Sequence, residues 1–360
     1  MRFKKFDKQM TFGDLDIMES RSFKNKRLET LKEIEALIDW TRVEAILNKN
    51  YPMYQDGPGN PPYPPLLLFK CLLLQKWFNI KADTELETQI NDSNAFRSFL
   101  DLPWSSASPD HSTFSRFRGR LTKHDFDRIT SDILTQFSEH GIKINEGIAV
   151  DARLVKSASR PVSGEKLKEI REDRSEKGGF IDKNGNVCKF SRDVESDWTV
   201  KNDKPHYGLK EHTSVDVNHG FVLCTVMSPA SVHDTNYFQY CTIFSRHTKQ
   251  KLERAYADKG YHGEVNRSFL SLNNIQDGIM RKDTTTARLT EYEKERNKGI
   301  SKFRYIVEQY FGISELHYGA ERARFTTIAK NNLDAWFRQV AFNIQKGVKV
   351  VGKMAAEPAL

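Results

Sequence analysis

The hydrophobic pattern of this chain changes in kind close to His140-Gly141. Before that point apolar residues recur about every 3.6 positions, as on helices that bury one face. After it, stretches with a period of two alternate with helical stretches. A chain of 360 residues is long enough for two domains. We therefore expect a helical domain over residues 1–140 and a domain of strands and helices over residues 141–350.

The composition limits the class of protein. Hydrophobic residues make up 38% and charged residues 29% of the chain, which is typical of a folded domain in water. The densest apolar stretch, residues 66–78, is interrupted by Lys70 and Lys76 and is too short to span a bilayer, so no membrane partner is expected. None of the four cysteines forms a CxxC pair, so a reducing cytoplasm fits. A net charge of +8 suits a partner rich in phosphate.

The first domain is predicted to consist of helices. Apolar periodicity predicts a helix over residues 28–47, and Pro65 is expected to open an apolar helix that ends near Phe78. Capping residues then predict three more starts, at Asp83 or Thr84, at Asp110 before a helix over 111–121, and at Asp125 before a helix that runs to Phe137.

The second domain is predicted to hold five strands, over residues 144–155, 208–217, 220–228, 252–257 and 277–281. Helices are predicted over residues 235–247, 266–273, 291–312 and 332–346. Three strands, a helix and then alternating strands and helices is the order of a ribonuclease-H-like α+β or α/β fold with a mixed five-stranded sheet. Residues 156–205 separate the first two strands, and we interpret them as an inserted, functional loop.

Three acidic residues lie where a carboxylate needs a partner or a ligand. Asp151 lies inside the first strand, Asp258 directly follows the fourth strand, and Glu308 lies in a helix four residues after Arg304. Taken singly, each has an ordinary interpretation: a solvent-facing edge residue, a turn-forming aspartate, and an i,i+4 salt bridge.

Taken together, the three acids predict metal-dependent chemistry on phosphodiesters. Carboxylates that meet at one point repel one another unless divalent cations neutralise them, and oxygen ligands suit Mg²⁺ or Mn²⁺. Two such ions about 3.5–4 Å apart would hold the attacking and leaving oxygens of a phosphodiester. We therefore expect Asp151, Asp258 and Glu308 to be catalytic residues and metal ligands, with two ions in each active site.

Seven sequence motifs carry a family resemblance. They are PPYPPLLLFKCLLLQKWF, LETQINDSNAFRSFLDL and SPDHSTFSRFRGRL in the first half, and AVDARLVKS, YGLKEHTSVD, YADKGYHG and RYIVEQYFG in the second. In order and approximate spacing, from about Trp40 to Lys346, they resemble the insertion-sequence DDE transposases of the insertion-sequence-five group. The three acids of that family fall on Asp151, Asp258 and Glu308.

The resemblance implies an activity and its partners. The N-terminal domain is expected to bind the terminal inverted repeats of a mobile element. The catalytic domain is expected to nick those ends and to transfer their 3′-hydroxyls to target DNA. Because two ends must be held together, a homodimer on double-stranded DNA is expected. The expected location is the cytoplasm of a bacterium, on the nucleoid when DNA is bound.

The resemblance also singles out residues around the acids. Arg304 matches a basic residue four before the family's glutamate, and Arg322 and Arg324 match an RAR motif, so all three are expected at the DNA. Ser301 stands where a tyrosine is expected, and Glu315 where a DNA-contacting lysine is expected. These departures leave two alternatives open: a nuclease that cleaves without joining, and a DNA-binding protein with a degenerate catalytic domain.

The basic helix over residues 111–121 is the first candidate for DNA contact. With the preceding helix it would form a helix-turn-helix that reads the element ends through His111, Ser112, Arg116, Arg118 and Arg120. The alternative is a basic surface helix that packs through its phenylalanines.

The segment before the second strand is the other candidate. Trp198 lies among charged residues and is expected to stack on an unpaired base, unless it is a clamp that packs the insert onto the sheet. Lys201, Lys204 and Lys210 are expected to contact phosphates at the rim of the active site.

Overall fold

The computed structural model describes residues 3–5, 25–51, 61–144, 146–177, 180–181, 187–188, 193–247, 251–285 and 287–356. The chain divides into two compact units. The first comprises Met1–Ile142 and Val340–Leu360, and the second comprises Lys143–Gln339. No helix within the described ranges is long and apolar enough to cross a membrane.

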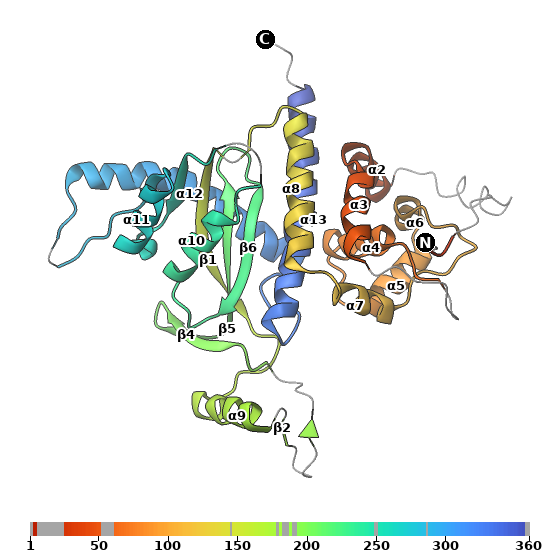
Figure 1. The fold of residues 1–360 in the computed structure, drawn as a ribbon, viewed down its shortest axis with the longest axis horizontal. Coiled ribbons are helices and arrows are strands. Elements are labelled where there is room, and N and C mark those ends of the chain that lie inside the picture. Colours follow the sequence, from red (N-terminus) through yellow and green to blue (C-terminus); the bar gives the residue numbers. More distant parts are fainter. Residues whose placement is uncertain are drawn as a thin grey trace. The chain divides into compact units, whose positions relative to one another are not determined.

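The first unit is helical (Figure 1). Its helices are α2 (Lys26–Leu37), α3 (Trp40–Asn50), α4 (Pro65–Trp77), α5 (Asp83–Asp92), α6 (Asn94–Leu100), α7 (His111–Arg118) and α8 (Lys123–Glu139). Helix α4 is mostly apolar and is buried along almost its whole length, Lys70 and Lys76 included, so it forms the centre of this unit. Pro65 begins it, as the sequence predicted.

Side-chain caps decide where several of these helices begin. Asp110 is confirmed as the N-cap of α7, because its Oδ1 accepts a hydrogen bond of 2.6 Å from the backbone N–H of Thr113. The single helix predicted over residues 28–47 is wrong: Asp39 caps a new helix at Trp40 and interrupts the periodic stretch. Helix α8 begins before Asp125, since Thr122 is its cap and Asp125 completes a capping box.

The second unit is built on a mixed sheet of β1 (Gly147–Lys156), β5 (Lys204–Asp216), β6 (Val222–Pro229), β7 (Arg254–Ala257) and β8 (Gln276–Ile279). Strand β1 is antiparallel to β5 and parallel to β7, and β8 continues the parallel side. Strand β6 is antiparallel to β5 on its other edge. All five predicted strands are present, and their order, β6-β5-β1-β7-β8, is that of a ribonuclease-H-like fold.

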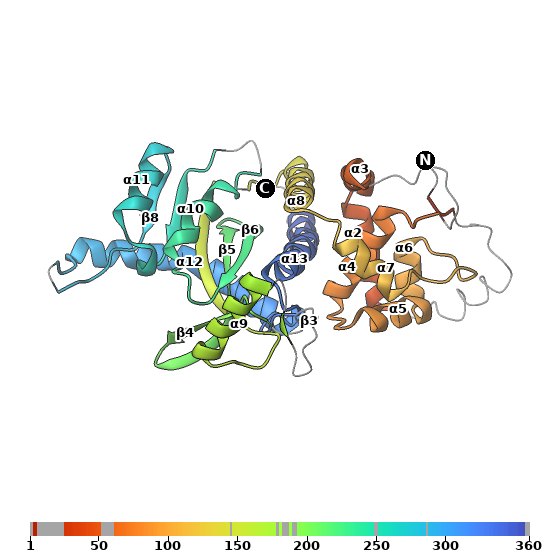
Figure 2. The same ribbon diagram turned by 60° about the horizontal axis from the view of Figure 1, so that its bottom comes forward.

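Two helices cover opposite faces of this sheet (Figures 1 and 2). Side chains of β5 alternate between them: His212 stacks on Tyr237 of α10 (Thr235–Ile243), whereas Glu211 contacts Tyr310 of α12 (Glu291–Tyr318). Between β7 and β8 lies α11 (Glu264–Leu272). The face under α12 is the one that carries the candidate site.

The insert is not the plain loop that the sequence predicted. It contains α9 (Gly164–Lys177), β2 (Phe180–Ile181), β3 (Val187–Cys188) and β4 (Asp197–Lys201). Strand β4 pairs with the first residues of β5, so the described sheet has six strands rather than five. The guanidinium of Arg171 on α9 donates to the carbonyls of Val194 and Ser196 and ties this helix to the start of β4.

The last helix, α13 (Ile328–Ala356), contributes to both units. Residues up to 339 belong to the second unit and those from Val340 to the first. In the first unit Gly347 approaches α8 so closely that a Cβ there would lie 2.3 Å from the ring of Phe137. The change of period at residue 141 gives no sign of this return of the chain.

Candidate active site

Asp151 and Asp258 follow equivalent positions of neighbouring parallel strands. The register pairs Val150 of β1 with Ala257 of β7. Asp151 directly follows Val150, and Asp258 directly follows Ala257. Adjacent strands lie about 4.8 Å apart. The pairing of β1 with β7 therefore brings together two acids that are more than a hundred positions apart in the sequence.

Asp258 is held in a tight turn. Its Oδ1 accepts a hydrogen bond of 2.7 Å from the backbone N–H of Gly260 and caps the short 3₁₀ helix Lys259–Tyr261. A Cβ at Gly260 would lie 2.9 Å from that oxygen, so a larger residue there would require the Asp258 carboxylate to move. Asp258 is thus also the turn-forming aspartate that the sequence allowed.

Arg304 connects Asp151 to Glu308. Its Nη2 lies 2.8 Å from Oδ2 of Asp151 and 3.7 Å from Oε1 of Glu308 on the same helix. The two carboxylates are therefore no farther apart than these two distances added together. The i,i+4 bridge expected between Arg304 and Glu308 is present, and the same guanidinium also reaches across to β1.

The surroundings of Asp151 oppose its ionisation. Burial raises the pKa of Asp151, and the nearby charge of Asp258 raises it further. The Arg304 guanidinium and the backbone N–H of Ala152, which donates at 2.8 Å, act in the opposite direction. Burial prevails, so the pKa of Asp151 lies above its ordinary value, and a cation bound beside this carboxylate would lower it.

The carboxylate oxygens of the three acids are suitable ligands for a divalent cation, but their present positions do not form a binding site for one. In the described part of the chain, no three His, Cys, Asp or Glu side chains are close enough to hold a metal ion. The oxygens are engaged elsewhere, by Arg304 at Asp151 and by Gly260 at Asp258. Three carboxylate donors nevertheless match the ligand preference of Mg²⁺ or Mn²⁺.

The basic residues on α7 differ in exposure. Arg116 is exposed, whereas Arg118 is buried and its guanidinium binds both carboxylate oxygens of Asp83, at 2.9 and 3.1 Å. The helix-turn-helix predicted with the preceding helix is wrong: residues 101–110 separate α6 from α7, and a helix-turn-helix joins its helices by three or four residues.

The other candidates on α7 have mixed surroundings. His111 is exposed and its Nδ1 lies 3.1 Å from Oε2 of Glu87. The hydroxyl of Ser112 donates to Oδ1 of Asp110 at 2.9 Å. Arg120 is exposed with its guanidinium 5.3 Å from the ring centre of Tyr51. These contacts leave Arg116 and Arg120 the more accessible cations of the helix.

Trp198 has the contacts of a clamp. Its Nε1 donates to the carbonyl of Val162 at 2.7 Å, and its ring packs on Tyr207 with centroids 5.3 Å apart. Lys201 and Lys204 are exposed beside the turn that joins β4 to β5. A DNA contact by Trp198 stays a prediction.

Three further basic side chains that were expected to contact DNA contact other residues of the protein instead. Lys210 is mostly buried and its Nζ lies 2.9 Å from Oδ1 of Asp234. The Nε of Arg322 donates to the carbonyl of Ser157 at 2.9 Å. The guanidinium of Arg324 lies 5.5 Å from the ring centre of Phe325. The DNA roles of Lys210, Arg322 and Arg324 stay predictions.

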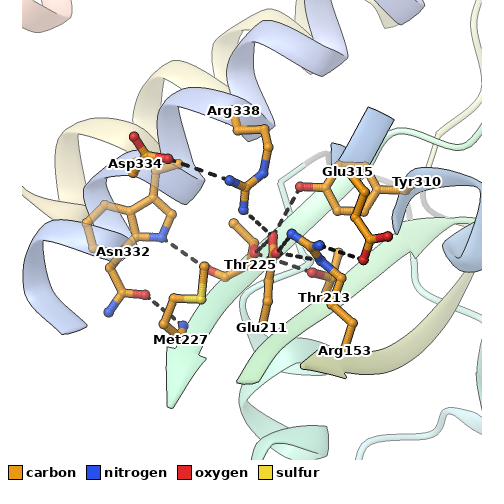
Figure 3. A network of polar contacts seen from close by, with 11 residues as sticks. Arg153, Glu211, Thr213, Thr225, Met227, Tyr310, Glu315, Asn332, Asp334 and Arg338 are labelled. Atoms are coloured by element: carbon orange, nitrogen blue, oxygen red, sulfur yellow. Dashed lines mark hydrogen bonds and ion pairs between the residues drawn. The ribbon is translucent and has the colours of Figure 1, made fainter. Parts of the chain in front are cut away.

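Sequence reasoning missed a buried charged group on the same face as Asp151. Glu211 is fully buried between the guanidinium groups of Arg153 and Arg338 (Figure 3). Burial alone would raise the pKa of Glu211, but the two guanidinium groups outweigh it and lower this pKa to about 2. Glu315, which departs from the family pattern, lies 3.1 Å from Nη1 of Arg153. The available signal was the run of consecutive polar residues at 210–214 inside a predicted strand.

The strand order of this sheet, with α10 and α12 on its opposite faces, defines a ribonuclease-H-like fold. Residues 144–344 match the transposase DDE domain family, and residues 18–120 match a second family described as a transposase domain, DUF772. The first match covers more than half of the chain, so the chain belongs to the transposase DDE domain family.

Solved structures of transposases have also been matched to this chain. One is the piggyBac transposase synaptic complex with hairpin DNA, at 10% identity over 94% of this chain and 83% of that chain, with a TM-score of 0.34. Another is a pre-cleavage Mos1 transpososome, at 10% identity over 94% of this chain and 100% of that chain, with a TM-score of 0.22.

Proposed function

We propose that this transposase nicks the ends of a mobile DNA element and transfers the freed 3′-hydroxyls to target DNA. The observation that carries the proposal is the grouping of acids: Asp151 and Asp258 follow paired positions of β1 and β7, and Arg304 joins Asp151 to Glu308. Two carboxylates from neighbouring parallel strands and one from the helix that covers them are donors of the kind that phosphodiester chemistry at two cations requires.

Asp151, Asp258 and Glu308 would hold two Mg²⁺ or Mn²⁺ ions. When bound, such ions activate the attacking hydroxyl or water and stabilise the departing 3′-oxygen. The protein contributes the fixed placement of the carboxylates, two from the sheet and one from α12. Arg304 balances the charge of Asp151 and Glu308 in the free protein.

The partner is double-stranded DNA, both the element ends and the target. A net charge of +8 favours binding to phosphates, and the exposed Arg116, Arg120, Lys201 and Lys204 offer contacts in both units. We assign the reading of the terminal repeats to the helical unit and the chemistry to the second unit. Two ends require two active sites, so we propose a homodimer on DNA.

Incubation with the flanking element-end DNA and Mg²⁺ or Mn²⁺, followed by mapping of the nicks, tests the first step. Wild type is expected to cut at the element boundary, and Asp151→Asn and Asp258→Ala are expected to bind the same DNA without cutting it. Cutting by either variant at the wild-type rate would remove that residue from the active site.

A pre-cut element end with a free 3′-hydroxyl tests the second step. Joined products in the presence of target DNA support transposition. Cutting without joining would instead support a nuclease. Tight binding with neither reaction would support a DNA-binding protein whose catalytic domain is inactive.

A further inference from the structure

Glu211 receives hydrogen bonds from four other elements (Figure 3). Arg153 of β1 donates through Nε at 2.8 Å and through Nη2 at 2.5 Å, and Arg338 of α13 donates through Nη2 at 2.7 Å. The hydroxyl of Tyr310 on α12 donates at 3.3 Å and that of Thr225 on β6 at 3.1 Å. The side chains of Glu211 and Arg338 are almost completely excluded from solvent.

Two residues of this network, Arg153 and Tyr310, are each two positions from a proposed catalytic acid in the sequence. Arg153 is two residues after Asp151 and points to the same face of β1, because alternate residues of a strand share a face. Tyr310 is two residues after Glu308 on α12. Arg153 also reaches Glu315, one turn and more beyond Tyr310. The network therefore ties α12 to β1 directly through Glu315, and to β5 through Tyr310 and Glu211, which Arg153 of β1 also binds.

A contribution to folding stability alone does not explain a buried network of charged side chains. Removing charges from water carries a large desolvation cost, and apolar side chains of similar volume often stabilise a core as well or better. Directional hydrogen bonds to one buried carboxylate fix the position of α12 on the sheet. The helix cannot slide or rotate there without breaking its bonds to Glu211 and Arg153.

We propose that Glu211 is a positioning residue for the acidic site. Through Tyr310 and Arg153 it fixes α12 on β1, so that Glu308 faces Asp151 and Asp258. The inference rests on the proposed function, because the position of Glu308 matters only if the three acids act together.

Tyr310→Phe tests this with little disturbance, since it removes one hydroxyl and keeps the buried ring. The matched control is Tyr207→Phe, which also removes one buried hydroxyl, the one that donates to the carbonyl of Asp193 at 2.9 Å in the insert. We expect Tyr310→Phe to nick about tenfold more slowly than the control at saturating DNA and metal, because small misplacements of reacting groups are costly. The Tm and the KM for DNA should match those of the control.

Glu211→Gln is expected to reduce the nicking rate further, about a hundredfold. If this variant does not fold, Tyr310→Phe decides alone. A Tyr310→Phe protein with a lower Tm whose folded fraction nicks at the control rate would show a merely structural role and overturn the inference.

Mn²⁺ binding followed by electron paramagnetic resonance separates this inference from the proposed function. A wild type that does not nick would overturn the proposed function. In that case Tyr310→Phe must still bind Mn²⁺ about fivefold more weakly than Tyr207→Phe, since the ligands are less well placed. Equal affinities would overturn the positioning role.

Discussion

The Nη2 atom of Arg304 lies 2.8 Å from Oδ2 of Asp151, so a guanidinium occupies the position beside this carboxylate where a metal ion would bind. A second carboxylate, Glu308, lies 3.7 Å from the same nitrogen. A fixed positive charge between two ligands competes with a divalent cation for their oxygens.

We therefore predict that Arg304→Gln binds Mn²⁺ more tightly than wild type in the absence of DNA, by about tenfold. The measurement is calorimetric titration at pH 8, because burial raises the pKa of Asp151 and removing Arg304 raises it further. Arg288→Gln is the control, since it breaks an exposed bridge to Asp283 elsewhere on the protein. Weaker binding by Arg304→Gln would mean that the guanidinium supports the ligands and does not compete.

Two arginines on α7 should give opposite phenotypes. Arg116 is exposed, and Arg116→Ala is expected to leave the Tm unchanged while it weakens DNA binding and lowers the salt dependence by about one unit. Arg118 is buried against Asp83, and Arg118→Ala should cost about 3–5 kcal/mol of folding free energy, because it removes the guanidinium that balances the charge of this carboxylate. DNA titrations at several salt concentrations and thermal melts distinguish the two. Equal melting temperatures would contradict the assignment of Arg118 to the core.

Local patterns in the sequence predicted what is local in the structure. An acid inside one strand signal located Asp151, and an acid directly after another located Asp258. Turn and capping residues located most element starts. The helix over residues 28–47 failed because apolar periodicity continues across the break, while the Asp39 cap ends one helix and starts the next. A single polar side chain outweighed an otherwise regular pattern.

What the sequence did not reveal depends on long-range partners. Glu315 read as a departure from the family pattern, yet it pairs with Arg153, which lies 162 positions earlier. Glu211 has no neighbour in the chain that marks it as buried between two arginines. The same holds for Arg118, which the helix pattern made a DNA contact and which Asp83 holds in the interior. Neither period nor spacing carries these pairings, because they arise only when strands and helices pack.

The two ion pairs of Arg153, with Glu315 and with Glu211, should contribute unequally to the free energy of unfolding. Glu315 is about half exposed, so Glu315→Gln is expected to cost less than about 1 kcal/mol. Arg153→Met leaves Glu211 with Arg338 as its remaining guanidinium and should cost about 3–5 kcal/mol. Urea denaturation of both variants gives the two values. A large loss in Glu315→Gln would place the main energetic contribution at the surface bridge instead.

His212 makes the stability of the second unit depend on pH. Its ring is buried, stacks on Tyr237 at 4.2 Å, and has Nε2 2.8 Å from Oγ of Ser228. Burial lowers the pKa of His212 to about 4, from an ordinary value of 6.5. Between pH 6.5 and about pH 4, His212 is therefore protonated in the unfolded chain and neutral in the folded chain. The contribution is complete above pH 6.5 and is lost as the pH falls towards 4.

Over that interval wild type should lose about 3 kcal/mol more stability than His212→Phe, whose ring still stacks on Tyr237 but cannot take up a proton. At pH 7 the variant is expected to be the less stable protein, because it lacks the bond to Ser228. Urea denaturation of both proteins from pH 7 to pH 4 measures the difference, and other titrating groups cancel because both chains carry them. An NMR titration of the His212 ring checks the pKa directly. Parallel stability curves, or a His212 that protonates near pH 6.5, would mean that solvent reaches this ring and that α10 does not seal this face of the sheet.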